Sequence, residues 1–241
     1  MSEREHRRRI VAIETSGRQG SVLVAVDGDV LGATQFAADL QHASQLLPAI
    51  DRLCETVTWR PGDIDEVYVS AGPGSFTGCR IGVTVARALA QAVGVRLVRV
   101  PTTAALARNA LRHDPRPRDL VVLLDAQRRQ VYATHFRLDG DEYGPQGELR
   151  LGDPKDLLSE LPRPCAALGE GIAYHRRAVE GAGLSILPEP YWPARAEDVL
   201  HVGLGLARQG VYTPANEIVP IYVRLPEAEE RWRQRHDNSR A

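Results

Sequence analysis

The stretch GPGSFTGCRIG, residues 72–82, decides the fold because it joins a predicted strand to a predicted helix through closely spaced glycines. Before it, residues 64–72 form an apolar run of strand length. After it, residues 75–93 are rich in alanine, with apolar side chains recurring at helical spacing. A further apolar run at residues 95–100 predicts a second strand. Strand, helix and strand in this order predict a parallel crossover unit.

The glycines of this stretch leave two interpretations open. Gly72 and Gly74 flank Pro73, so the turn can adopt backbone angles that other residues avoid. Ser75 and Thr77 are suited to cap the helix that follows, whose free N–H groups would favour an anion. The stretch has neither the Gly-Lys-Ser/Thr of a Walker loop nor the spacing of a dinucleotide fingerprint. The alternative is that the glycines let strand and helix pack closely and that nothing binds there.

The residues before this unit predict an antiparallel meander. Apolar runs at residues 10–14, 21–26 and 30–36 are separated by turns that contain glycine. Residues 44–57 instead carry apolar side chains at helical spacing. We expect that helix to begin at 44 or shortly after, because Pro48 is tolerated only in a first turn. The first hundred residues therefore combine a meander with a crossover sheet.

The second half repeats the pattern of the first. Residues 121–136 and 11–26 each contain an apolar strand that ends in an acidic residue, then a polar turn and a second strand. Glu14 and Asp125 occupy corresponding positions. Internal duplication is one explanation and chance is the other, because strand–turn–strand patterns are common. The chain after Phe136 is loop-rich, and the segments expected in this half are a Pro-rich connection at 112–119, helices at 154–161 and 199–210, an ordered piece at 218–224 and a mobile tail from 225.

Composition places the chain among ordinary globular proteins. It has 241 residues, of which 43% are hydrophobic and 25% charged, and a formal net charge of −1. No run approaches the roughly 18 apolar residues of a membrane span, and no signal-peptide pattern follows the charged N-terminus, so we expect a cytoplasmic protein. Three widely spaced cysteines argue against a disulfide framework. Arg7, Arg8 and Arg9 form a basic cluster, for which a solvated terminus and a contact with nucleic-acid phosphates are both open.

Several motifs point together to one family. In chain order they are ETS (14–16), HASQLLPAI (42–50), GPGSFTGCRIG (72–82), DAQRRQVY (125–132) and PIYVR (220–224). On these pieces the chain resembles the TsaB family, the bacterial dimerisation subunits of the tRNA threonylcarbamoyladenosine machinery. GPGSFTG is highly specific, whereas ETS and PIYVR alone are weak. The chain departs from the family's usual pattern at Glu14, where Asp is usual, and at Ala43, where Ser is usual.

The resemblance implies an α/β fold of the ASKHA type, the actin/hexokinase-like and ribonuclease H-like architecture. Such a fold has two lobes with mixed sheets flanked by helices. We expect residues 10–104 to form the N-terminal lobe, which carries the partner-binding helices. Residues 105–224 are expected to form the C-terminal lobe, with a last helix that packs back on the first lobe. Residues 1–9 and 225–241 are expected to be mobile termini.

The resemblance also implies a function. In that family the larger TsaD-type partner transfers threonylcarbamoyl from its adenylate to the adenosine next to the tRNA anticodon. This chain would be a non-catalytic scaffold that binds and stabilises that partner. A TsaE-type ATPase, tRNA reached through the complex and a homodimer are the other implied partners. We expect no catalytic residue and no metal, because no two of the seven histidines are four residues apart, as the metal ligands of the TsaD-type partner are.

The rival class is an independent ASKHA-type phosphotransferase that depends on a nucleotide. Thr15 and Ser16 would donate to phosphate oxygens, and Gly74 and Ser75 begin the helix whose N–H groups would complete the site. ATP or ADP is the cofactor that this alternative requires, whereas the scaffold has none of its own. The chain contains no G-x-S-x-G hydrolase elbow and no H-E-x-x-H motif, so the sequence favours neither a hydrolase nor a metalloprotease.

A protein without chemistry of its own acts through its surface. The predicted helices at 44–57 and 75–93 each carry an apolar stripe with further small or apolar residues beside it. One explanation is that both helices are simply buried. The resemblance favours the other, a two-helix face that packs against matching helices of the TsaD-type partner. The residues assigned to this face are Leu46, Leu47, Ile50, Leu53, Cys54, Ile81, Val83, Val85 and Leu89.

Overall fold

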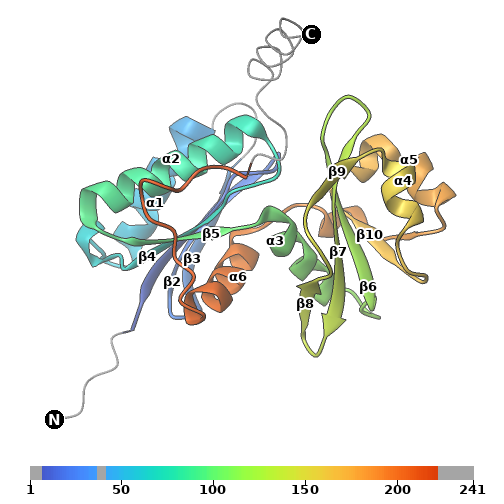
Figure 1. Cartoon of the computed structure of the whole chain (residues 1–241). Coiled ribbons are helices and arrows are strands. Elements are labelled where there is room, and N and C mark those ends of the chain that lie inside the picture. Colours follow the sequence, from blue (N-terminus) through green and yellow to red (C-terminus); the bar gives the residue numbers. More distant parts are fainter. Residues whose placement is uncertain (1–6, 37–41, 222–241) are drawn as a thin grey trace, which may run out of the picture.

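Two lobes lie side by side in the computed structural model, each built on one mixed sheet (Figure 1). The structure describes residues 7–36 and 42–221, without the side chains of His42 and Ala43. The expected tail at 225–241 and the departure at Ala43 therefore lie outside the described part of the chain.

The first sheet is organised around its central strand, β1. β1 pairs antiparallel with β2 and parallel with β4, and the order across the sheet is β3-β2-β1-β4-β5. The predicted meander followed by a parallel crossover is therefore confirmed. The bounds of the strands are β1 (Arg9–Glu14), β2 (Gly20–Val26), β3 (Asp29–Phe36), β4 (Glu66–Ser70) and β5 (Arg96–Val100).

Helices cover both faces of this sheet, with α1 and α2 on one face and α6 on the other (Figure 1). Alternate side chains of β1 enter the two cores: Val11 and Ile13 pack with α1 and α2, and Ile10 and Ala12 pack with α6. A strand covered on both faces needs apolar side chains at every position, which explains the unbroken run IVAI. The helices are α1 (His42–Thr56), α2 (Phe76–Val93) and α6 (Ala196–Arg208).

The second sheet repeats the order of the first. Its strands run β11-β10-β6-β7-β8, with β6 antiparallel to β7 and parallel to β10, so that β6 corresponds to β1. β1 ends at Glu14 and β6 ends at Asp125, the correspondence that the sequence pattern predicted. β9 also pairs with β7. The bounds are β6 (Asp119–Asp125), β7 (Val131–Asp139), β8 (Glu142–Pro145), β9 (Arg150–Gly152), β10 (Ala166–Leu168) and β11 (Ser185–Ile186).

The helices of the second lobe enclose a separate core around β6. Helix α3 lies at the junction of the lobes in Figure 1, where it contacts both β6 and α6. The remaining helical segments are α3 (Thr102–Asn109), α4 (Pro154–Ser159), α5 (Ile172–Gly181) and the short 3-10 turns η1 (Pro61–Asp63), η2 (Ala110–Arg112) and η3 (Glu189–Tyr191).

The structure corrects several expected boundaries. Helix α1 begins at His42, so Pro48 lies inside it rather than in its first turn, and the buried apolar stripe outweighs the one hydrogen bond that proline cannot donate. Helix α6 begins at Ala196, where the acidic Glu197 and Asp198 suit the positive end of the helix dipole. The loop-rich region after Phe136 contains four short strands and α5. Those strands have four residues or fewer, too short for a periodic signal.

Candidate functional site

The GPG turn packs directly against the turn that follows β1. Ser75 donates its backbone N–H to the Ser16 carbonyl at 2.7 Å, and its side chain caps α2 by accepting from the Gly78 N–H at 3.2 Å. A Cβ atom on Gly74 would stand 2.5 Å from the Ser16 carbonyl oxygen, and one on Gly78 would stand 1.9 Å from the Thr15 carbonyl oxygen. These glycines are therefore required by the close approach of two backbones, which is the packing interpretation of the stretch.

The four residues considered for a nucleotide or anion, Thr15, Ser16, Gly74 and Ser75, come together in this joint. Thr15 Oγ1 donates to the Gly78 carbonyl at 2.8 Å. Ser16 donates both its backbone N–H, at 2.5 Å, and its hydroxyl, at 2.6 Å, to one carboxylate oxygen of Glu14. The hydrogens that a phosphate would accept from these two hydroxyls are thus already donated within the chain.

Glu14 is the acidic residue at the centre of this joint, and its side chain has no exposed surface. Burial raises the pKa of the Glu14 carboxyl, because desolvation penalises the charged form more than the hydrogen bonds from Ser16 favour it. Its second oxygen, Oε2, makes no hydrogen bond with any described residue. Desolvation also raises the pKa of the neighbouring Cys79 thiol to about 12. The environment of Glu14 therefore favours the protonated form of its carboxyl more than water does.

The residues assigned to the α1/α2 interface fall into two groups that differ in their exposure to solvent. Leu47 is 51% exposed, and Ile81 and Leu89 are half-buried. Phe76, which the sequence reading did not assign, is 47% exposed at the first position of α2, with the Arg80 guanidinium 4.5 Å from its ring centre. The residues of the other group lie in the chain's own core, and they are Leu46, Ile50, Leu53, Cys54, Val83 and Val85.

The arginines of the N-terminal cluster form ion pairs with acidic side chains. Arg7 Nε lies 3.3 Å and Arg8 Nε lies 3.5 Å from Asp27, and Arg9 Nη1 lies 3.1 Å from Asp63. Arg9 is already part of β1, where the sequence reading expected a mobile terminus. These pairs neutralise the cluster, which weakens the case for a contact between these arginines and nucleic acid.

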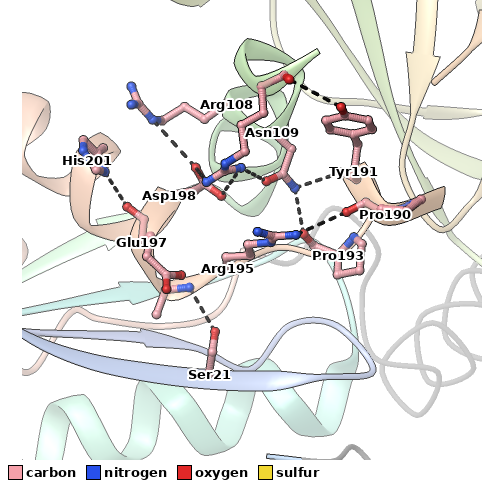
Figure 2. A network of polar contacts seen from close by, with 12 residues as sticks. Ser21, Arg108, Asn109, Pro190, Tyr191, Pro193, Arg195, Glu197, Asp198 and His201 are labelled. Atoms are coloured by element: carbon pink, nitrogen blue, oxygen red, sulfur yellow. Dashed lines mark hydrogen bonds and ion pairs between the residues drawn. The ribbon is translucent and has the colours of Figure 1, made fainter. Parts of the chain in front are cut away.

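A polar network joins the two lobes beneath α3 (Figure 2). Arg112 makes a bidentate pair with the buried Asp198 of α6, at 3.1 and 2.9 Å. Asn109 donates to the carbonyls of Tyr191 at 2.9 Å and Pro193 at 2.7 Å. The network therefore fixes the chain on its way from the second lobe into α6, which completes the first.

The described part of the chain holds neither a cluster of metal-ligating side chains nor a membrane-spanning helix. Within residues 7–36 and 42–221, no three His, Cys, Asp or Glu side chains are grouped so as to hold a metal ion. No described helix has the length and apolar character needed to cross a membrane.

The repeated strand order, with two lobes and helices on both faces of the first sheet, defines the ASKHA class of folds. A family model described as "TsaD: tRNA N6-adenosine threonylcarbamoyltransferase" matches residues 36–222. The chain belongs to this family.

Curated relatives take their names from the threonylcarbamoyladenosine modification of tRNA. The tRNA threonylcarbamoyladenosine biosynthesis protein TsaB of Bacillus subtilis is 27% identical over 229 residues, which cover 92% of this chain and 97% of that protein. The protein of the same name from Escherichia coli is 26% identical over 220 residues, with 90% and 94% coverage. These relatives confirm the resemblance to TsaB that the motifs predicted.

Solved structures agree on the fold. A Pseudomonas aeruginosa protein described as similar to the peptidase YeaZ superposes with a TM-score of 0.77 at 24% identity, covering 90% of this chain and 100% of that one. A structure described as YeaZ from the same organism gives a TM-score of 0.75 at 23% identity, with the same coverage. The predicted two-lobe α/β fold is therefore confirmed.

Proposed function

We propose that this chain is a non-catalytic, cytoplasmic scaffold subunit that binds and stabilises a TsaD-type subunit. That complex would transfer threonylcarbamoyl to the adenosine adjacent to the tRNA anticodon. The observation that carries the proposal is the α1/α2 face, on which Leu47 and Phe76 are each about half exposed while both helices are otherwise packed into the first core. The names of the curated relatives supply the biological process.

The exposed apolar side chains favour a protein partner. Burying a leucine or phenylalanine side chain contributes about 1.5–3 kcal/mol, and folding of the isolated chain leaves about half of that gain unrealised at Leu47 and Phe76. Aromatic residues are also enriched among the residues that dominate interface energies. A TsaD-type partner of the same fold class would present a matching pair of helices, so that two similar faces pack together.

The joint at Glu14 to Ser16 supports a subunit without its own phosphotransfer chemistry. Thr15 and Ser16 donate their hydroxyl hydrogens within the chain, and the GPG turn lies against them at packing distance. We therefore propose that this turn is a structural joint and that it binds no ATP or ADP. Calorimetry of the isolated chain with each nucleotide tests this point. Saturable heat with ATP or ADP, abolished by Ser16→Ala, would restore the phosphotransferase alternative.

The face is tested with Leu47→Asp, which places a charge where about half of the side chain is already in water and so leaves folding intact. A matched control is Val211→Asp, since Val211 is 48% exposed but lies after α6. We expect Leu47→Asp to reduce co-purification of the TsaD-type subunit strongly and Val211→Asp to leave it unchanged. Val83 is a poor site for this test because it is 4% exposed and a charge there would disrupt the core. Equal binding by all three chains would refute the assignment of the face.

Activity is tested by reconstitution. Purified TsaD-type subunit, TsaE-type ATPase, tRNA and threonylcarbamoyl-adenylate precursors are combined with and without this chain. We expect modified adenosine only when this chain is present, and far less with Leu47→Asp. Turnover by this chain alone would contradict the scaffold. We further propose that the same face pairs two copies of this chain when the partner is absent, so Leu47→Asp should lower the sedimenting mass at high protein concentration.

A further inference from the structure

The turn between β6 and β7 has an unusual backbone for its sequence. Gln130 donates its N–H to the Gln127 carbonyl at 2.9 Å, and the two central residues, Arg128 and Arg129, have φ of 50° and 63°. Two positive φ angles are what a type I′ turn requires, and Asn-Gly is the sequence that adopts them at least cost. Gln127 also has a positive φ, of 59°. None of these positions is a glycine, so the positive φ angles reduce the stability of the turn. The tip of the turn carries long polar side chains instead.

The tip projects at the top of the second lobe in Figure 1, and both arginines are exposed. The base of the hairpin is held to α5, because His175 Nε2 lies 3.3 Å from Asp125 Oδ1. The residue before it, Tyr174, is 60% exposed. The hairpin tip and this exposed ring therefore belong to the same end of the second lobe.

The turn after β1, in the first lobe, contacts this end of the second lobe. Arg18, in the turn after β1, donates to the Tyr174 hydroxyl at 2.6 Å. Glu170 approaches the same turn, since its Oε1 would stand 3.8 Å from a Cβ atom on Gly17. Arg18, Arg128 and Arg129 thus lie at the same end of the molecule as Tyr174.

We propose that Arg18, Arg128, Arg129 and Tyr174 form a contact surface for a single-stranded RNA loop. The arginines would pair with phosphates and the exposed tyrosine ring would stack on an unpaired base. The inference rests on the proposed function, in which the substrate adenosine lies in a tRNA loop. Arginine and tyrosine on a projecting tip favour RNA over a protein partner here, because the exposed aliphatic residues, such as Leu31 and Leu47, belong to the first lobe.

The strained turn allows a test in which stability and binding move in opposite directions. The double variant Arg128→Asn/Arg129→Gly supplies the preferred type I′ sequence and removes both charges. We expect a higher thermal midpoint together with about tenfold weaker binding of an unmodified anticodon stem-loop RNA. The slope of log K against log salt should fall by about 1.4, the amount for two phosphate contacts with a single strand. A fully paired RNA duplex is the comparison probe, and its affinity should change less.

Tyr174 separates stacking from hydrogen bonding. Tyr174→Phe removes the hydroxyl that Arg18 contacts but keeps the ring, so we expect binding close to that of the unchanged chain. Tyr174→Ala removes the ring and should weaken binding of the stem-loop about tenfold.

The assay is performed on the full chain alone and on its complex with the TsaD-type subunit. Unchanged stem-loop affinity and salt slope in the double variant would overturn the inference, as would equal losses for the stem-loop and the duplex. Binding of the double variant to the TsaD-type subunit is measured in parallel. Intact partner binding with unchanged RNA affinity refutes only the RNA surface. Failure of the unmodified chain to bind the partner refutes the proposed function, while RNA binding by the chain alone still decides the inference.

Discussion

Gly78→Ala tests the idea that the GPGSFTG stretch is a packing joint. The added Cβ would lie 1.9 Å from the Thr15 carbonyl oxygen, which is 1.1 Å closer than the 3.0 Å that real Cβ contacts keep. Because that neighbour is backbone of the turn directly after β1, it cannot rotate away as a side chain could. Helix α2 must therefore withdraw from the sheet by about 1 Å, and a gap of that size forfeits between a quarter and a half of each affected contact.

The expected magnitude follows from three contributions. Overpacking against a rigid neighbour costs about 3 kcal/mol. The hydrogen bond from Thr15 Oγ1 to the Gly78 carbonyl, 2.8 Å long in the native chain, is stretched at a cost of about 1 kcal/mol. Replacing glycine by alanine within a helix gains back about 1 kcal/mol. We therefore expect a net loss of about 3 kcal/mol in the free energy of unfolding.

Urea denaturation followed by circular dichroism measures this loss, and Gly205→Ala is the matched control. Gly205 also lies inside a helix, α6, but a Cβ atom there would have no neighbour within 4 Å. We expect that variant to be more stable than the parent by about 0.5–1 kcal/mol. A loss below about 1 kcal/mol for Gly78→Ala, or equal losses for both variants, would refute the reasoning.

Two further predictions concern buried titratable groups, the Glu14 carboxyl of the first lobe and the cysteine thiols of both lobes. Because burial raises the pKa of Glu14, its contribution to stability is present below the unfolded value and is lost as the pH rises through the folded value. Glu14→Gln keeps the acceptor for Ser16 without titrating, so its stability relative to the parent should increase as the pH rises above the unfolded pKa of a glutamate, about 4.3; a difference that stays constant or shrinks in urea titrations at rising pH would contradict a raised pKa of Glu14. The three free cysteines, Cys54, Cys79 and Cys165, are buried, and desolvation raises the pKa of each thiol, to about 12 for Cys79 and Cys165. We expect negligible reaction with a thiol reagent at pH 8 in the native chain and three reacting thiols after denaturation; a thiol that reacts rapidly in the native chain would show that this burial is wrong.

Much of the first lobe was predictable because its signals are local. The helix expected at 75–93 is α2 from Phe76, set by the Ser75 cap and the left-handed Gly94, and the strands of the meander differ from their predicted bounds by one residue at most. The paired ends of β1 and β6 were also predictable, because both carry the same strand–acid–turn pattern.

The environment of each residue was less predictable. Cys54 and Val83 lie beside the apolar stripes and suggest a second face, but both side chains are buried in the core that α1, α2 and the first sheet share. The pattern likewise equates Glu14 with Asp125, yet Glu14 has no exposed surface while the side chain of Asp125 is 31% exposed. Burial of this kind depends on contacts between distant segments, which periodicity does not contain.

The return of α6 to the first lobe has a consequence for how the chain is made. Residues of β1, β2, β4 and β5 present one apolar face, and most of its described cover comes from α6, which begins at Ala196. During synthesis from the N-terminus the first sheet is therefore complete long before the helix that shields it. At about 5–20 residues per second, the roughly 100 residues between β5 and α6 take several seconds to emerge. For that interval the nascent chain exposes a surface that invites aggregation, and a ribosome-associated chaperone would find its binding site there.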